Sequence, residues 1–321
     1  MLERKHLAWL VLAAFVVAGA CAPLLAPRDP TTYSDPSISR NRPPLSQLVA
    51  VDLDDGRRLY TDQLRHDGDH VILEDVERQR SIPLDQLVEH DAITTQTFLL
   101  GTDRFGRDVL SRLLWGARVS LLIGLLVTLI ALTVGLPIGT LAALGGPVVD
   151  GVLMRIVDVF LAFPWIFLII TLAAMIDGSG LAVLIVVLGG TSWMAISRVA
   201  RAMIRELRDQ AFVTATRGLG AGPIYLAVQH LIPHALPPIL IQAALGAARV
   251  VLAEAALSFI GLGIQPPEPS WGNMINDGRT GLLSAWWVAG FPTLALIVTV
   301  LALSEIAETL RHRLTPYRLE P

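Results

Sequence analysis

The sequence has little charge and almost no cysteine, and both shortages exclude classes of protein. Asp, Glu, Lys and Arg together make up 17% of the 321 residues, whereas a soluble globular domain carries about 25%. The single cysteine, Cys21, excludes a disulfide within the chain. The formal net charge of −3 is too close to zero to indicate a protein that binds nucleic acid.

Catalytic motifs are missing as well. The sequence has no GxxxxGKS or GxxxxGKT loop, so it cannot bind ATP in that way, and it has neither a GxSxG elbow nor an HExxH pair. Three histidines, His66, His70 and His90, lack the spacing of a metal site and are expected to be solvated. We therefore expect no enzyme activity, no catalytic residue, no metal site and no cofactor in this chain.

Long apolar runs are abundant. Hydrophobic residues make up 53% of the chain, and apolar runs recur at about the 20-residue length that a membrane-spanning helix needs. This pattern predicts an all-α polytopic membrane protein with about six transmembrane helices. We expect them at residues 7–25, 119–144, 152–176, 181–198, 238–262 and 285–306.

The first apolar run follows Arg4 and Lys5. A cleaved signal peptide, or a lipoprotein signal that ends before Cys21, starts in the same way. This run continues past Cys21 to Ala26, and no leucine stands in the three residues before the cysteine. We therefore expect residues 1–27 to remain as an N-terminal transmembrane helix.

The next segment, residues 28–100, is polar and contains short alternating stretches. Its Asp55-Gly56 pair between alternating flanks predicts a β-hairpin, and residues 70–77 and 82–88 are expected to add short strands. We expect a small strand-rich insert outside the bilayer. Five further transmembrane helices are expected in the core at residues 101–321.

The most basic connection between predicted spans is the segment 198–238, whose arginines are Arg198, Arg201, Arg205, Arg208 and Arg217. Glycine and proline are poor helix formers, and they interrupt this segment at Gly218, Gly220, Gly222 and Pro223. A short second helix is expected at residues 224–232, stopped by Pro233. The segment therefore predicts helix, tight turn and helix, although an ordinary positive loop that only sets topology is the alternative.

The placement of positive charge predicts the orientation in the membrane, because arginine and lysine near span ends favour the cytoplasmic side. Both termini and the segment 198–238 are expected in the cytoplasm, and residues 28–100 outside it. The basic residues at the carboxyl end are Arg311, Arg313 and Arg318.

The stretch AFVTATRGLGAGPIYLAVQHLIPHALPPIL resembles the EAA loop of ABC-importer permease subunits. Gly220 stands at the glycine of that motif, and the run from His230 to Pro233 stands at its end. Thr214-Ala215-Thr216 replaces the Glu-Ala-Ala triplet, so the acidic residue is absent and its role cannot be transferred to this chain.

Two further stretches resemble the di- and oligopeptide (and nickel) branch of that family, and in particular the C-type permease of its heterodimeric pair. The first is GTDRFGRDVLSRLLWGARVSL, and the second is EAALSFIGLGIQPPEPSWGNM. In the first, Thr102 or Asp103 is expected to cap an interfacial helix whose early turns carry Arg107, Arg112 and Arg118. Three tryptophans are expected at the membrane interface, namely Trp271 within the second stretch and Trp286 and Trp287 after it.

The resemblance implies the type I ABC importer permease fold in a bacterial-type cytoplasmic (inner) membrane. It implies a second homologous permease, two cytoplasmic ATPases that bind ATP and Mg, an extracytoplasmic solute-binding protein and membrane lipid as partners, and no nucleic acid. The implied function is ATP-driven, binding-protein-dependent import of di- or oligopeptides by alternating access. Nickel or another small solute is an alternative substrate. An ion-coupled secondary transporter is a second alternative, and it would use Glu254, Asp158 and Arg249.

Two groups of candidate site residues follow. The loop that would dock and couple to the ATPases comprises Phe212, Thr214, Ala215, Thr216, Arg217, Leu219, Gly220, His230 and Pro233. Glu254 is expected to line the translocation path or to bond across the permease pair, because a carboxylate in a span is costly. The alternative is that Glu254 is solvated near the outer end of its span.

Overall fold

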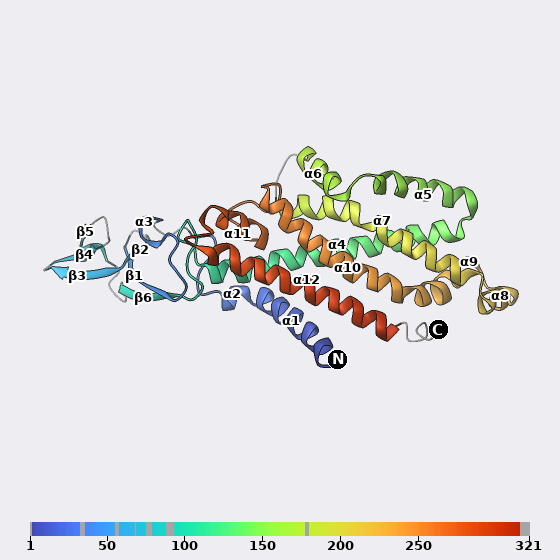
Figure 1. The fold of residues 1–321 in the computed structure, drawn as a ribbon, viewed down its shortest axis with the longest axis horizontal. Coiled ribbons are helices and arrows are strands. Elements are labelled where there is room, and N and C mark those ends of the chain that lie inside the picture. The colour runs from blue at the N-terminus through green and yellow to red at the C-terminus, as the bar shows by residue number, and fades with distance from the viewer. Residues whose placement is uncertain are drawn as a thin grey trace. The chain divides into compact units, whose positions relative to one another are not determined.

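A computed structural model describes residues 2–32, 36–54, 58–67, 69–74, 79–87, 93–176 and 180–314. The chain divides into two compact units (Figure 1). Unit 1 is drawn from Met1–Val17, Ser120–Ile264 and Leu296–Pro321, and unit 2 from Ala18–Val119 and Gln265–Ala295. His90, Arg318, the Asp55-Gly56 pair and the side chain of His66 lie outside the described parts.

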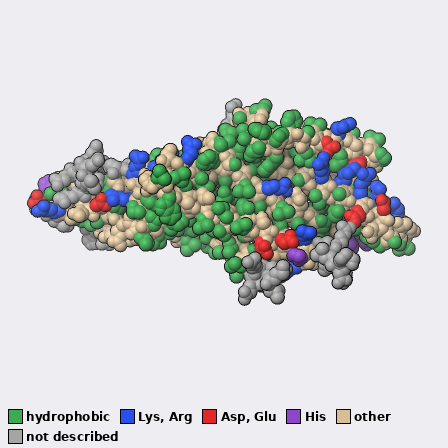
Figure 2. Space-filling model, viewed as in Figure 1, with side chains coloured by type: hydrophobic (Ala, Val, Ile, Leu, Met, Phe, Trp, Pro, Cys, Tyr) green, Lys and Arg blue, Asp and Glu red, His purple; other side chains and the backbone are tan. Residues whose placement is uncertain are grey.

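The expectation of a helical multi-pass membrane protein is confirmed. The described residues contain four helices that are long and apolar enough to cross a membrane. They are Val109–Leu144 (α4), Leu181–Arg208 (α7), Pro223–Phe259, which joins α9 (Pro223–Leu226) to α10 (Ile232–Phe259), and Trp286–Arg313, which lies in α12 (Trp286–Leu314). Hydrophobic side chains cover most of the visible face over the helices of unit 1 (Figure 2).

A fifth candidate span is a bent pair of helices. The predicted span at residues 152–176 forms two helices, α5 (Gly146–Ala162) and α6 (Trp165–Met175), which are bent by 89°. The break falls at Phe163-Pro164, because a proline ring clashes with the preceding turn and cannot donate a backbone hydrogen bond. The expected turn at residues 177–179 lies outside the described residues.

The N-terminal run is shorter than the predicted sixth span. It forms α1 (Leu2–Ala20) and α2 (Ala22–Leu25), and the apolar part of α1 is Leu7–Ala20. Pro23 has no backbone N–H for the carbonyl of Gly19, so one continuous helix cannot keep its hydrogen bonds through Cys21. The count of spans in the described residues is therefore four, or five with the bent pair, instead of six.

Within unit 1, α4 and α7 approach closely at two glycines one turn apart. A Cβ atom on Gly135 would lie 2.6 Å from the carbonyl oxygen of Trp193, and one on Gly139 would lie 2.5 Å from that of Ser197. Small residues at this spacing allow two transmembrane helices to pack backbone to backbone. The same pairing surrounds a core that includes Ala200.

Unit 2 contains two three-stranded antiparallel sheets, as the predicted strand-rich insert requires. The first has the order β2-β1-β6, with β1 (Ser46–Asp52), β2 (Arg58–Thr61) and β6 (Ile93–Phe98). The second has the order β3-β4-β5, with β3 (Gln63–Asp67), β4 (His70–Glu74) and β5 (Gln79–Pro83). The predicted hairpin is the β1–β2 pair, in which Val49 faces Thr61 and Asp52 faces Arg58. Instead of extending the strand, Leu84–Gln86 forms a 3-10 turn. A short helix, α3 (Pro36–Ser39), precedes β1.

A buried ionic network in unit 2 corrects the expected interfacial helix. Arg107 and Arg112 are each 1% exposed. Arg107 donates to Asp103 at 2.6 Å and to Asp277 at 2.7 Å, and Arg112 lies 3.5 Å from Asp277. The network therefore joins the start of α4 to α11 (Trp271–Gly278). The predicted caps Thr102 and Asp103 are wrong, because Asp108 accepts the backbone N–H of Ser111 at 2.8 Å.

The three tryptophans differ in their environment. Trp271 is fully buried within unit 2, where its indole N–H donates to the carbonyl of Leu113 at 3.1 Å, so it is a core residue and not an interfacial anchor. Trp287 is 6% exposed and donates to the carbonyl of Thr102. Only Trp286, at 55% exposure, keeps the environment expected of an interfacial tryptophan.

Candidate functional site

The segment between α7 and α10 folds as helix, turn and helix. A short helix, α8 (Ala211–Gly218), follows α7, and a turn then leads into α9 (Figure 1). Gly220 in this turn has φ +88°, and a Cβ atom built on it would meet no atom within 4 Å. The glycine is therefore required by its left-handed backbone conformation and not by close approach of another segment.

The second helix does not stop at Pro233, contrary to the sequence-based expectation. After α9 the chain makes a π-helical turn, Ala227–Leu231, and continues directly into α10. Pro233 lies in the first turn of α10, a position that tolerates a missing N–H. A π-turn inside a helix also commonly marks a functional site.

The turn presents apolar side chains to solvent. Leu219 is 90% exposed, Ile224 is 78% exposed and Phe212 is 37% exposed. Phe212 and Leu219 were expected from the sequence, whereas Ile224 was missed together with its exposed neighbours Tyr225 and Val228. The sequence could have predicted the exposure of these three residues, because apolar residues directly after the Gly222-Pro223 break cannot all face the core from so short a helix.

The remaining predicted docking residues have ordinary environments. Thr214 and Thr216 donate their hydroxyls to carbonyls of the preceding turn, Gln210 and Phe212 respectively. Exposed positions are occupied by Ala215, Arg217 and Pro233. His230 is half-buried, and its ring lies 5.6 Å from that of Tyr225.

The loop is tied firmly to the helices of unit 1. Val213 of α8 is fully buried and Leu226 of α9 is 3% exposed. Both belong to one hydrophobic core with Ile204 of α7 and Leu231. One face of the loop is therefore fixed by packing while the other presents apolar groups outward.

Most of the arginines of α7 are paired with carboxylates of α5. Asp150 accepts two hydrogen bonds from Arg201, and Arg205 lies 3.4 Å from the same carboxylate. Asp158 pairs with Arg198 at 2.5 Å. Basic side chains gather over this region in Figure 2. These arginines bind α5 to α7 within unit 1, in addition to any effect on topology.

Glu254 is fully buried within unit 1. One of its oxygens accepts the hydroxyl of Ser120 in α4 at 2.8 Å, and the other accepts that of Ser258 at 2.8 Å. The alternative of a carboxylate solvated near the end of its span is wrong for this chain. The role in a translocation path stays a prediction.

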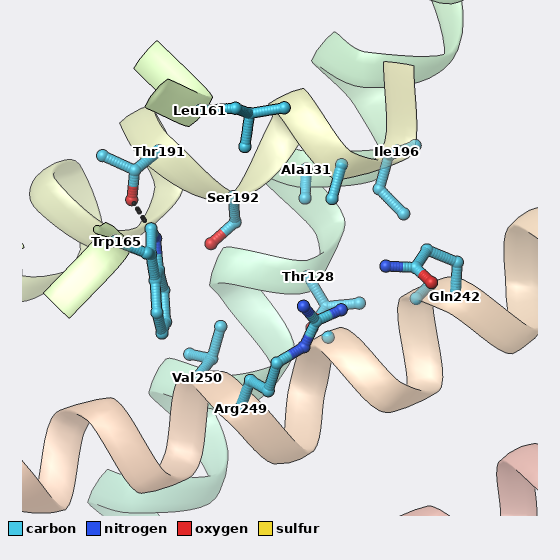
Figure 3. A pocket seen from close by; sticks show the side chains of 13 residues that line it. Thr128, Ala131, Leu161, Trp165, Thr191, Ser192, Ile196, Gln242, Arg249 and Val250 are labelled. Atoms are coloured by element: carbon cyan, nitrogen blue, oxygen red, sulfur yellow. Dashed lines mark hydrogen bonds between the residues drawn. The ribbon is translucent and has the colours of Figure 1, made fainter. Parts of the chain in front are cut away.

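A cavity of about 150 Å³ lies among the helices of unit 1. Its lining residues come from α4, α5, α6, α7 and α10, and Figure 3 shows the side chains of Ser192, Gln242 and Arg249 around one common space. Trp165 closes one side and donates its indole N–H to the hydroxyl of Thr191 at 3.1 Å. No group of histidine, cysteine or carboxylate side chains that could hold a metal ion occurs in the described part of the chain.

Comparisons with known proteins identify the family to which this sequence is similar. A family described as the inner membrane component of binding-protein-dependent transport systems matches residues 135–317. The chain is 41% identical over 218 residues to a putative peptide permease protein of Brucella suis, with 67% of this chain and 72% of the relative covered. It is 39% identical over 219 residues to the di/tripeptide transport system permease protein DppC of Pseudomonas aeruginosa, with 68% and 72% covered.

Solved structures agree on the fold. An inward-facing structure of the MetNI methionine ABC transporter aligns with a TM-score of 0.53 at 20% identity, over 63% of this chain and 96% of the other. A second crystal form of the same transporter aligns with a TM-score of 0.54 at 22% identity. The family match covers more than half of the sequence, and the helical core agrees with it. The chain is therefore a member of the family of inner membrane components of binding-protein-dependent transport systems.

Proposed function

We propose that this chain is a permease subunit of an ATP-driven importer of di- or oligopeptides. The observation that carries the proposal is its identity of about 40% to relatives named as peptide permeases. A second homologous permease would complete the translocation path in a bacterial-type inner membrane. A solute-binding protein outside would deliver the peptide. ATP and Mg would be held by two partner ATPases, with no cofactor in this chain.

The loop at Gly220 is the proposed site of coupling to the ATPases. Its outward apolar groups, chiefly Leu219 and Ile224, suit a hydrophobic cleft, because leaving them in water has no benefit to an unpartnered protein. Arg217 would set the register against an acidic rim. Since Val213 and Leu226 fix the other face in the core, movement of the ATPase would reach α7 and α10 through a stiff element.

The alternatives have less support. An ion-coupled secondary transporter is not favoured, because the family is that of binding-protein-dependent systems. Of the three residues it would use, Asp158 is paired with Arg198 and Glu254 with two serines. Nickel is not favoured as substrate either, since the relatives from Brucella suis and Pseudomonas aeruginosa are named for peptides.

The proposal is tested by co-expressing the chain with the partner permease and ATPases, and by reconstituting the complex in vesicles with its binding protein. We expect ATP-dependent uptake of a labelled dipeptide, and no ATPase activity from this chain alone. Uptake driven by an ion gradient without the ATPases would contradict the proposal.

The orientation predicts where single cysteines are labelled. In a Cys21→Ser chain, we expect Asp54→Cys to react with an impermeant maleimide only from outside the cell. Gly218→Cys, at an exposed position with open space around it, is expected to react only from the cytoplasmic side. Labelling of Asp54→Cys from the cytoplasm alone would reverse the proposed topology.

We propose that the second sheet of the insert is a docking surface or a lid for the solute-binding protein. The alternative is a tolerated surface insertion that has no role. Thr61 is the last residue of β2 and Ile93 is the first residue of β6. They pair with Val49 and Val51 on opposite sides of β1, so they lie about 12 Å apart. A four-residue glycine-serine linker replacing residues 62–92 spans this distance. We expect lost uptake at normal membrane levels, and unchanged uptake would remove the docking role.

The Glu254 carboxylate is expected to hold α4 to α10. Glu254→Leu leaves the hydroxyls of Ser120 and Ser258 without their buried acceptor, so we expect a loss of about 1–3 kcal/mol in unfolding free energy. Glu254→Gln keeps an acceptor and the shape, and its loss is expected to be smaller. Thermal unfolding in detergent measures both, and equal stability of the two variants would contradict the bridging role. Lost uptake by an assembled Glu254→Gln complex would support the path role.

A further inference from the structure

The cavity in unit 1 has an unusual arrangement of hydrogen-bond donors. Gln242, Gly246 and Arg249 lie at i, i+4 and i+7 of α10, so they share one face of that helix, and all three line the cavity. A Cβ atom on Gly246 would meet nothing within 4 Å, so the face stays open between the two polar side chains. Figure 3 shows the ends of Gln242 and Arg249 next to this open space.

The hydroxyls of the cavity are committed elsewhere. Thr128 donates to the carbonyl of Gly124 at 2.7 Å, and Ser192 donates to that of Leu188 at 2.6 Å. In contrast, the Arg249 guanidinium and the Gln242 amide have no hydrogen bond or ion pair to any described residue. The donors that remain for a ligand are therefore a cation and an amide, which suit an anion.

The rest of the lining leaves that charge accessible to a ligand. The walls are largely apolar, with Ala131, Leu161, Ile196 and Val250 around the polar groups. Arg249 itself is exposed, so its guanidinium can contact a ligand without first leaving a protein partner. A charged side chain in a membrane span also typically marks a path for substrate or ions. A cavity of about 150 Å³ has the size that accepts a benzene-sized molecule, so it can hold one end of a peptide but not a whole tripeptide.

From these observations we infer that Arg249, assisted by Gln242, binds the C-terminal carboxylate of a peptide during its passage. A guanidinium matches a carboxylate with two parallel hydrogen bonds, and every unmodified peptide carries this group. The inference rests on the proposed function, because it names the part of the substrate that this subunit recognises.

The test compares Arg249→Gln with the wild-type complex in vesicles that contain the same binding protein. Three peptides are used: a dipeptide with a free carboxyl end, its C-terminal amide, and an amide with an acidic side chain. For each peptide the ratio of variant to wild-type uptake is measured, so the preference of the binding protein cancels. We expect about a tenfold loss for the free acid and less than a twofold loss for both amides.

Two control variants isolate the charge at the cavity. Arg155→Gln removes a cation that is exposed on α5 and does not line the cavity, and it is expected to leave all three ratios near one. Arg249→Lys keeps the charge without the forked geometry and is expected to fall between Arg249→Gln and wild type. An equal loss for acid and amides would overturn the inference, as would no loss at all. A selective loss for the acidic side chain alone would assign the site to that carboxylate and overturn the terminal one.

A second measurement does not depend on removing the arginine. Gly246→Cys in a Cys21→Ser chain places the only thiol in open space between Gln242 and Arg249. The free-acid peptide is expected to slow its reaction with a maleimide severalfold, whereas the amide is not. Equal protection by both peptides would overturn the inference alone, while wild-type complexes that import no peptide would overturn the proposed function as well.

Discussion

Gly220→Asp is expected to lower ATP-driven uptake at least tenfold while the protein still folds and inserts. Gly220 has φ +88°, a conformation that costs a residue with a side chain roughly 1–2 kcal/mol. Its surroundings are open, and Leu219 beside it is 90% exposed, so the change does not disturb the core of unit 1. The new carboxylate would also face the acidic rim that Arg217 is proposed to contact. Pull-down of the ATPases and uptake in vesicles measure the two parts of the effect.

Gly222 offers a matched control in the same turn. It has φ −72°, a Cβ atom there would also meet nothing within 4 Å, and it caps α9. Aspartate is a favoured residue at a helix N-cap, so Gly222→Asp adds the same charge nearby without backbone strain. We expect Gly222→Asp to keep most of the uptake. Full ATPase retention with wild-type uptake in Gly220→Asp would show that this loop is not the coupling element.

Asp277→Ala is expected to destabilise unit 2 by about 3–5 kcal/mol, because it removes one partner from a buried ionic cluster. Asp277 accepts from Arg107 at 2.7 Å and from Arg104 at 2.9 Å, and Arg112 lies 3.5 Å away. After the change, Asp103 would still lie beside Arg107 and Arg112, at 2.6 and 3.6 Å, but the carboxylate shared with α11 would be lost. The measurement is thermal unfolding of the purified chain in detergent, together with its level in the membrane.

The exposed ion pair of the insert is the control for this effect. Asp52 accepts two hydrogen bonds from Arg58 at 2.5 and 2.7 Å, but their side chains are 28% and 46% exposed. An exposed pair of this kind contributes about 0–1 kcal/mol, so Asp52→Ala is expected to change stability little. Equal losses in Asp52→Ala and Asp277→Ala would contradict the role assigned to the buried cluster.

Local sequence features were sufficient for the class of protein and for the turn at Gly220. The apolar runs predicted a helical membrane protein because their length is set by the bilayer. Gly220 and Pro223 predicted the turn, since the backbone preferences of glycine and proline act within a few residues. The same local logic failed at Pro233, where a proline in a first helical turn is tolerated and the helix continues.

Tertiary packing alone decided which polar side chains are buried and which remain open to a ligand. Arg107 and Arg112 fit the pattern of a basic interfacial turn, yet carboxylates as distant in sequence as Asp277 enclose them. Glu254 is bonded to Ser120, 134 residues away in the chain. Arg249, like Glu254, stands between apolar residues in the sequence. In the structure, however, it pairs with no carboxylate among the described residues, and it lines a cavity instead. The physical reason is that burying a charge depends on the partner that packing brings to it, and no short-range pattern encodes that partner.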